Sequence, residues 1–561
     1  MIDSMDALHG NALEETATTR RPWVQSYGDI APHIDPDAYG SIVELLEQAM
    51  VQYADKTAFR SFGQSLSFRD VDRLSARFAS CLQRELGVRK GDRIAVMMPN
   101  LAAFPVVFLG IARLGAVQVN VNPLYTPREL AHQLADAGVK IIVVFNGSTP
   151  TLAEAVKESP VEHIIGVAPG DALPKPLPGP VPDARLGAVM PLSEILREDK
   201  PSGYQAPALT GDDLLFLQYT GGTTGLSKGA CLSHRNLVAN TEQYKAFMHS
   251  TIRPGDEVVV TALPLYHIFA LMVNFISYFS VGAENWLVAN PRDLDGLIDT
   301  FKQSRLTVFA GVNTLYAGLA AHPRLKEVDF TNLRLSAGGG AAVIEATAAR
   351  WKEVTGCLIL EGYGLSETSP VLSINPPSVG RFTHTTGLPV PSTDIKLVDD
   401  EGREVSLGQP GEICARGPQV MSGYWQQPEA NAAAFTADGY FRTGDVGVLD
   451  EQGFLKIVDR IKDMIIVSGF NVYPNEIEAV ATACPGVAEC ACVGAPDEKT
   501  GEALRLFVVK APGATLSEQD VIDHCRASLT GYKVPRLVRI VEALPKSTVG
   551  KILRRELRDV A

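Results

Sequence analysis

Between about Tyr39 and Leu360 the sequence alternates short apolar runs with longer amphipathic segments, and this alternation restricts the possible folds more than any other feature. Apolar runs of strand length lie at 93–99, 140–145, 214–220, 257–264, 306–312 and 358–363. The segment 67–86 has Ser67 as a candidate N-cap and apolar residues at helical spacing, which predicts a helix. Strands buried on both faces read as continuous apolar runs, and alternation with helices is typical of parallel sheets. We therefore expect an α/β fold.

The rest of the chain indicates further units, and 561 residues are enough for roughly two to four domains. Proline occupies every second position from 174 to 182, so we interpret 171–207 as an exposed connector or surface loop. After about residue 385, short glycine-punctuated strands predict a β-rich subdomain, and the last hundred residues predict a small α+β domain. The predicted domains are an N-terminal extension, 1–38, a large domain of mostly parallel sheets flanked by helices, 39–460, and the small C-terminal domain, 461–561.

Composition excludes several classes of protein. The net charge is −13, so no global basic field exists to hold nucleic acid. The longest apolar stretches, 102–112 and 269–279, are too short to cross a bilayer and are interpreted as core. The eight cysteines form no CxxC pair, which favours reduced thiols, and the acidic first 22 residues do not resemble a signal peptide. We expect a cytoplasmic protein with no nucleic-acid partner, whose contact with the inner face of a membrane is at most peripheral, and we leave a homodimer open.

The segment from Tyr219 to Gly229 reads YTGGTTGLSKG and lies between an apolar strand and a helix-like run that starts at His234. Its glycines allow backbone N–H groups to turn inward around an anion, its hydroxyls add donors, and Lys228 adds a point charge. Lys228 is followed by Gly229 and not by Ser or Thr, so the segment is not a Walker loop. We predict a phosphate-binding loop formed by Thr220, Gly221, Gly222, Thr223, Thr224, Gly225 and Lys228.

This loop resembles the phosphate loop of the adenylate-forming enzymes, a superfamily of acyl-CoA synthetases, firefly luciferase and peptide-synthetase adenylation domains. Six more segments match the superfamily in the same order: LPLYHIFA (263–270), SAGGG (336–340), EGYGLSETSP (361–370), YFRTGDVG (440–447), DRIKDMIIVSGFNVYPNEIE (459–478) and PKSTVGKILRREL (545–557). The resemblance covers about residues 39–561. Within the superfamily, the sequences of these segments are most similar to those of bacterial long-chain fatty acyl-CoA synthetases.

The resemblance implies an ATP-dependent ligase that joins a long-chain fatty acid to CoA and releases AMP and pyrophosphate. ATP and CoA would be its co-substrates, and Mg²⁺ would be its cofactor. A carboxylate is a poor electrophile, and conversion to an acyl-adenylate supplies the leaving group that a thiol can displace. The acid is the open point: the alternatives are a CoA ligase for medium-chain or aromatic acids and an acyl-AMP ligase that loads a carrier protein. A nucleotide-binding regulatory protein without catalysis is disfavoured by intact Lys228, Glu367, Asp445 and Lys551.

The resemblance also implies a role for individual residues. Lys551 reaches the α-phosphate and the substrate carboxylate during adenylation, where its charge would stabilise the transition state. Glu367 holds Mg²⁺, which favours a carboxylate together with substrate phosphates. Tyr363 stacks on adenine, and the hydroxyl of Ser366 touches the α-phosphate, although the superfamily usually has threonine there. The other implied nucleotide contacts are Gly339, Gly340, Gly362, Gly364 and two ribose ligands, Asp445 and Arg460.

The remaining implied residues concern movement and the acyl group. Lys462 corresponds to a hinge, which is compatible with a charged linker at DRIKD. If the C-terminal domain swings about it, Lys551 leaves and the loop from Val467 to Asn471 enters, with Gly469 lining the pantetheine channel. His267 is either a core residue or a gate between the acyl and CoA channels. The apolar segments 263–281 and 309–319 line an acyl tunnel or form ordinary core.

Overall fold

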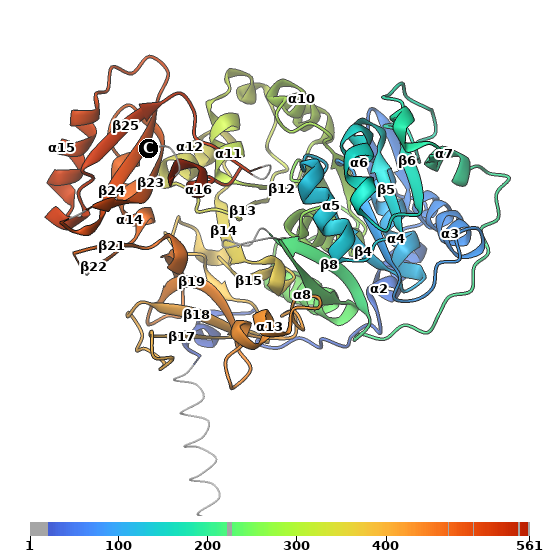
Figure 1. Ribbon diagram of the computed structural model, residues 1–561, viewed down its shortest axis with the longest axis horizontal. Helices are drawn as coiled ribbons and strands as arrows, with labels where there is room; N and C mark the ends of the chain where they lie inside the picture. The colour runs from blue at the N-terminus through green and yellow to red at the C-terminus, as the bar shows by residue number, and fades with distance from the viewer. Residues whose placement is uncertain (1–20, 221–226, 469, 498, 548–549, 559–561) are drawn as a thin grey trace, which may run out of the picture.

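The computed structural model describes residues 21–220, 227–468, 470–497, 499–547 and 550–558. Two large, mainly parallel sheets, a small antiparallel sheet and the sheet of the C-terminal domain make up the molecule. In Figure 1 the C-terminal domain lies on the left, and the sheet that contains β3 to β7 lies on the right. The α/β class with a large N-terminal part and a small C-terminal domain is confirmed.

The first large sheet has seven strands in the order β7-β6-β5-β3-β4-β8-β9, parallel except for the β8–β9 pair. Alternate residues of β3 enter two different cores, which is why its apolar run is continuous. Its strands are β3 (Arg93–Met97), β4 (Val117–Asn120), β5 (Ile141–Phe145), β6 (His163–Val167), β7 (Met190–Pro191), β8 (Leu214–Thr220) and β9 (Lys228–Ser233).

Helices cover both faces of this sheet. The helices α3 (Phe68–Arg84) and α4 (Ala103–Arg113) share one core with β3, and α5 (Pro127–Asp136) and α6 (Thr149–Ala155) share the other. The prediction of Ser67 as an N-cap is confirmed, because its side chain accepts a hydrogen bond from the backbone N–H of Asp70 in a reciprocal capping box. The apolar stretch 102–112 forms the buried helix α4, as its interpretation as core requires.

The second large sheet has nine strands in the order β16-β15-β14-β13-β12-β10-β11-β1-β2, parallel from β14 to β1 and antiparallel at both edges. Its central strands are β10 (Val258–Thr261), β11 (Glu284–Leu287), β12 (Val308–Gly311), β13 (Leu335–Gly338) and β14 (Ile359–Gly364). Its edge strands are β1 (Thr57–Ser61), β2 (Gln64–Ser67), β15 (Val371–Ile374) and β16 (Leu388–Pro389). Each of the six apolar runs named above therefore coincides with a strand of one of these two sheets, and only β14 extends beyond its run, by one residue.

The helices that precede or connect these strands are α2 (Ile42–Gln52), α8 (His234–Phe247), α10 (Leu294–Ser304), α11 (Asn313–Ala321) and α12 (Glu345–Thr355). The apolar stretch 269–279 contains a buried π-helix, η5 (Ala270–Ser277). π-Helices are rare, and those that do occur are frequently found at functional sites. This one begins three residues after His267, so an irregular, fully buried element leads away from the predicted gate.

The β-rich subdomain is a four-stranded antiparallel sheet of β17 (Asp394–Val398), β18 (Gly411–Arg416), β19 (Phe441–Leu449) and β20 (Leu455–Arg460). The helix α13 (Pro428–Ala434) lies beside it. The described residues before Tyr39 pack nearby: Trp23 is buried, and the Tyr27 hydroxyl donates to the Pro389 carbonyl at 2.6 Å. Residues 21–38 are thus attached to this part of the large domain.

The C-terminal domain has its own hydrophobic core. Its sheet has the order β22-β21-β24-β23, with β25 parallel to β24. Its strands are β21 (Ile465–Val467), β22 (Phe470–Val472), β23 (Val487–Asp497), β24 (Gly501–Lys510) and β25 (Leu537–Val541), and its helices are α14 (Pro474–Thr482), α15 (Glu518–Ser528) and α16 (Arg554–Arg558). No cysteine forms a disulfide, and none of the helices in the described ranges is long and apolar enough to span a membrane.

Candidate active site

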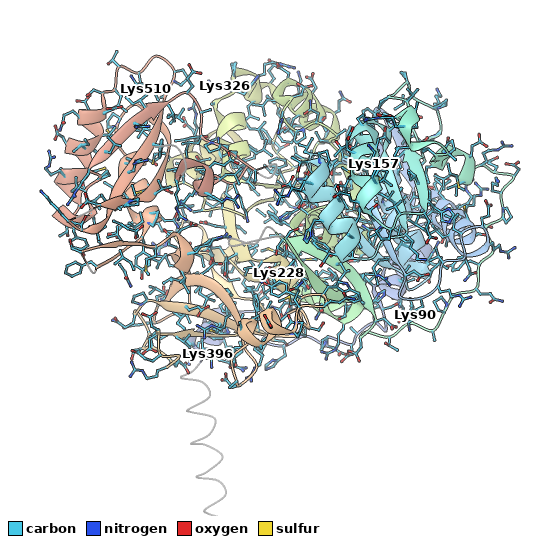
Figure 2. All side chains as sticks on the ribbon, viewed as in Figure 1. Lys90, Lys157, Lys228, Lys326, Lys396 and Lys510 are labelled. Atoms are coloured by element: carbon cyan, nitrogen blue, oxygen red, sulfur yellow. The ribbon has the colours of Figure 1, made fainter. Side chains whose placement is uncertain are left out.

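Several predicted site residues lie at or just after the ends of strands that meet in the middle of the molecule (Figure 2). Two residues of the predicted phosphate loop lie at strand ends: Thr220 is the last residue of β8, and Lys228 is the first residue of β9. Gly221, Gly222, Thr223, Thr224 and Gly225 lie outside the described residues. Figure 2 shows Lys228 near the centre, where the two large sheets and the β-rich subdomain meet, whereas the other labelled lysines lie toward the periphery. The end of β8 and the start of β9 therefore lie at a junction of three units.

Glu367 lies in the short 3₁₀ turn that follows β14, between Ser366 and Thr368. Its carboxylate is buried, and its Oε1 accepts from the Tyr424 hydroxyl at 2.9 Å and from Thr220 Oγ1 at 3.4 Å. Among the described residues, both hydrogen bonds to this carboxylate fall on Oε1, and none reaches Oε2. One available carboxylate oxygen beside a phosphate loop fits Mg²⁺, which usually binds one or two carboxylates and takes substrate phosphates as further ligands.

Glycine is required next to this turn. A Cβ on Gly364 would lie 1.8 Å from the backbone oxygen of Pro370, so no other residue fits there. Gly340 has a φ of +77°, in the left-handed region that favours glycine. Gly339 precedes it, and a Cβ there would lie 3.4 Å from the Gly362 oxygen and 3.3 Å from the Phe269 ring. Glycine therefore allows the chain after β14 to fold back against Pro370, and it allows the loop after β13 to pack against Gly362 of β14 and the Phe269 ring.

Asp445 and Arg460 face each other on neighbouring strands of the β-rich subdomain. Arg460 Nε lies 3.2 Å from Asp445 Oδ1, and the Tyr363 hydroxyl donates to Asp445 Oδ2 at 2.7 Å. Burial and the charge of Asp445 raise the pKa of Tyr363, so its hydroxyl remains a donor. Tyr363 belongs to β14 of the nine-stranded sheet. The pair predicted to hold ribose and the residue predicted to stack on adenine are thus in direct contact.

Lys551 reaches this site from the C-terminal domain. The turn that carries it is closed by two hydrogen bonds, Ser547 N to the Lys551 carbonyl at 2.7 Å and Lys551 N to Ser547 Oγ at 3.1 Å. A Cβ on Gly340 would lie 3.8 Å from Lys551 Cε, which places the lysine at the loop after β13. Burial and the positive charges of Arg460 and Lys462 lower the pKa of Lys551 to about 8, while Asp445 and Glu367 oppose this shift. Lys551 therefore interacts electrostatically with several other predicted site residues, including Asp445 and Glu367.

The predicted gate, hinge and channel residues differ in their placement. His267 is half-buried, and burial followed by the charge of Lys551 lowers its pKa to about 3, so its imidazole is neutral near pH 7. Lys462 lies in the turn directly after Arg460. Asn471 is exposed on β22, in a hairpin at the outer edge of the C-terminal domain and away from β8 and β14 (Figure 1). Asn471 is thus not brought to the site in this arrangement, and Gly469 lies outside the described residues.

Two residues of the site were missed by sequence reasoning. Glu361, in β14, is buried, and its carboxylate accepts from the backbone N–H of Val343 at 3.0 Å, which ties down the loop after β13. Burial raises the pKa of Glu361 to about 7, against the effect of this hydrogen bond. Tyr424 contacts Glu367 as described above. Glu361 begins the motif EGYGLSETSP, which could have drawn attention to it, whereas no spacing pattern singles out Tyr424.

Two mainly parallel sheets, an antiparallel subdomain and a small domain that delivers a lysine to their junction define the architecture of an adenylate-forming ligase. The chain belongs to the AMP-binding enzyme family: the model of that family matches residues 46–425, and the model of its C-terminal domain matches residues 476–551. The resemblance predicted from the motifs is thereby confirmed.

Curated relatives match over nearly the whole chain. A long-chain-fatty-acid–CoA ligase of Escherichia coli O157:H7 is 49% identical over 97% of this chain and 98% of its own length. The ligase of the same name from Bacillus subtilis is 34% identical over 96% of this chain and 98% of its own length.

Solved structures of this architecture match as well. The anthranilate CoA ligase AuaEII in complex with anthranoyl-AMP has a TM-score of 0.84 and 27% identity, covering 95% of this chain and 98% of its own. ATP-bound MatB from Rhodopseudomonas palustris has a TM-score of 0.81 and 32% identity, covering 92% of this chain and 98% of its own.

Proposed function

We propose that this protein is an ATP-dependent ligase that activates a long-chain fatty acid as the acyl-adenylate and transfers it to CoA, giving acyl-CoA, AMP and pyrophosphate. Six curated relatives named long-chain-fatty-acid–CoA ligase, 43–49% identical over 96–97% of this chain, support the substrate. The observation that carries the reaction type is the position of Lys551 beside Gly340, at the junction that also holds Lys228, Glu367 and Asp445.

In the first half-reaction, the fatty acid carboxylate attacks the α-phosphorus of ATP, and pyrophosphate leaves. Negative charge is present on both reactants, so the ammonium groups of Lys228 and Lys551 would stabilise the transition state. Asp445 would accept hydrogen bonds from the ribose, and Tyr363 would lie against adenine. Mg²⁺, held by Glu367 and the phosphates, would supply further charge neutralisation. The chain thus acts mainly by placing charges and reactants.

In the second half-reaction, the CoA thiol attacks the acyl carbon and AMP leaves. We propose that Lys462 is the hinge between a large domain, 39–460, and a C-terminal domain, 461–561. Movement about this hinge withdraws Lys551 and brings in the hairpin that contains Gly469 and Asn471. The outward position of Asn471 on β22 is consistent with the arrangement for the first half-reaction, in which Lys551 occupies the site (Figure 1). A hinge of few residues can absorb such a rotation.

A panel of acids tests the substrate. AMP release from purified protein with ATP and Mg²⁺ would be measured for fatty acids of increasing length and for aromatic acids, with and without CoA. Each buried methylene contributes about 0.8 kcal/mol, so four additional methylenes would raise kcat/KM up to roughly 200-fold if the acyl site accommodates them. We expect the highest values for long chains and a rise on adding CoA. A preference for aromatic acids, as the name of a feruloyl-CoA synthase relative of Amycolatopsis (35% identical) suggests for that protein, would contradict the proposed substrate.

The pH dependence of adenylation tests the role of Lys551. Because burial lowers the pKa of Lys551 to about 8 in the free protein, the lysine is charged below pH 8 and loses its charge above it. kcat/KM for ATP reports the ionisation of groups in the free enzyme. It should therefore decrease above pH 8, and at high pH the decrease should approach about tenfold for each pH unit. Lys551→Arg keeps its charge throughout and should lose this basic limb, although its activity is lower at every pH.

Lys462→Arg serves as the control for this pH profile, because Lys462 is another lysine near the site. We expect this variant to keep the fall above pH 8. A basic limb that persists unchanged in Lys551→Arg would mean that another group is responsible.

A further inference from the structure

Tyr424 belongs to a segment of the β-rich subdomain that is bound to the start of β9. Tyr424 forms an antiparallel bridge with Ala230, the backbone N–H of Trp425 donates to the Gly229 carbonyl at 2.8 Å, and that of Cys231 donates to the Gly423 carbonyl at 2.9 Å. Asn431 fixes the segment from the other side, with Oδ1 2.6 Å from Tyr424 N and Nδ2 3.0 Å from Tyr424 O. The backbone of Tyr424 is therefore held firmly against the strand that begins at Lys228.

The side chain of Tyr424 contacts two groups of opposite charge. Its hydroxyl donates to Glu367 Oε1 at 2.9 Å, and Lys228 Nζ lies 5.4 Å from the centre of its ring. An ionised carboxylate can only accept a hydrogen bond, so the phenol hydroxyl is the donor in this pair. A phenol ring attracts an ammonium group to its face, and a phenol hydroxyl bonds a carboxylate strongly. One side chain thus holds both a predicted phosphate-binding cation and the predicted Mg²⁺ carboxylate.

A second tyrosine of the same subdomain, Tyr440, also contacts both a carboxylate and a lysine, but among the described residues its lysine differs from Lys228 in having an ion-pair partner. The Tyr440 hydroxyl donates to Asp394 at 2.7 Å, and Lys396 Nζ lies 4.4 Å from the centre of its ring. Lys396, however, has a carboxylate partner of its own, Asp438, at 2.6 Å. Within the described ranges of the chain, Lys228 takes part in no ion pair. The Tyr424 ring therefore holds an ammonium group whose charge is left for a ligand.

We propose that Tyr424 is a positioning residue for the triphosphate of Mg·ATP: its ring holds the ammonium of Lys228, and its hydroxyl holds the carboxylate of Glu367. This inference rests on the proposed function, because it assigns the two charged groups to ATP phosphates and Mg²⁺. Separate contacts for the two groups would keep the lysine from pairing with the carboxylate before the nucleotide binds. The two charged groups would then already be oriented in the folded protein, so the free energy of orienting them would not reduce the affinity for ATP.

Two substitutions separate the contributions of the hydroxyl and the ring. Tyr424→Phe removes only the hydrogen bond to Glu367, whereas Tyr424→Leu removes the contact with Lys228 as well. Tyr440→Phe is the matched control, since it removes a tyrosine–carboxylate hydrogen bond in the same subdomain away from the phosphate loop. Calorimetry without fatty acid would measure the affinity of each variant for Mg·ATP and for AMP, which lacks the β- and γ-phosphates. The Mg²⁺ concentration that half-saturates pyrophosphate release would be measured in parallel.

We expect Tyr424→Phe to weaken Mg·ATP binding about 3- to 10-fold and to raise the half-saturating Mg²⁺ concentration by a similar factor. Tyr424→Leu should weaken Mg·ATP binding about 2- to 5-fold further. AMP affinity should change less than about 2-fold in both, and Tyr440→Phe should match the wild type. Unchanged Mg·ATP affinity in Tyr424→Phe, or an equal loss of AMP affinity, would overturn the proposal. If wild-type protein binds Mg·ATP but adenylates no acid, the proposed function fails while the calorimetric comparison still tests Tyr424.

Discussion

Replacement of Lys551 by alanine is expected to reduce adenylation by at least about 100-fold, because the substitution removes a positioned cation from a transition state that carries negative charge on both reactants. Thioester formation from supplied acyl-adenylate and CoA should stay within about 3-fold of wild type, since Lys551 acts only in the first half-reaction. Pyrophosphate release with fatty acid and ATP measures the first step. Loss of free CoA thiol in the presence of acyl-adenylate measures the second.

Lys546→Ala provides the matched control for this experiment. Lys546 lies five residues earlier in the same domain and forms an ion pair with Glu489 at 2.7 Å, in a half-exposed position on the C-terminal domain. Its loss should leave both half-reactions near the wild-type rate, because exposed ion pairs contribute little to stability. An equal loss of both half-reactions in Lys551→Ala would contradict the division of labour between them.

Replacement of Gly469 by leucine is expected to have the opposite effect. The resemblance to adenylate-forming enzymes implies that Gly469 lines the path of the pantetheine thiol, where a branched side chain would block the approach of the nucleophile. Thioester formation should fall by at least about 10-fold, because a small misplacement of a nucleophile costs about this much or more. Adenylation should stay within about 3-fold of wild type. The same two assays measure both effects.

Gly531→Leu controls for the insertion of a bulky side chain into the C-terminal domain. A Cβ at Gly531 would meet no atom within 4 Å, and its φ lies outside the left-handed region, so the substitution should be tolerated. Both half-reactions should proceed normally in this variant. Wild-type turnover with CoA in Gly469→Leu would show that no channel passes this residue.

The strands of the six apolar runs and the start of α3 were predictable because local patterns determine them. The run RIAVMMP forms β3 since its alternate side chains enter two cores, and Ser67 begins α3 through a capping box that the sequence reveals. The strand β9 was not predicted, because KGACLS has no continuous apolar run and pairs antiparallel with β8 only at the edge of the sheet. Nor could a π-helix be predicted for 270–277, since a uniformly apolar segment has no period that separates helix types.

The predictability of the site depended on contiguous motifs. Lys228, Glu367, Asp445 and Lys551 were found because each lies in a recognisable segment, and the structure brings those segments to one junction. The contact of Tyr424 with Glu367 joins residues 57 positions apart in different structural units, and no local pattern indicates such a tertiary contact. The packing of Tyr27 could not be predicted for the same reason, since its ring contacts Phe247 and its hydroxyl binds the carbonyl of Pro389, 362 residues away.

Pyrophosphate release in a single turnover without CoA tests the central claim most directly. Purified protein in excess over radiolabelled ATP would be mixed with Mg²⁺ and a long-chain fatty acid, and CoA would be added later. We predict that pyrophosphate and enzyme-bound acyl-adenylate form before CoA is present, and that free AMP and acyl-CoA appear rapidly once it is added. Failure to release pyrophosphate with any fatty acid, or release of ADP and inorganic phosphate instead, would contradict the account.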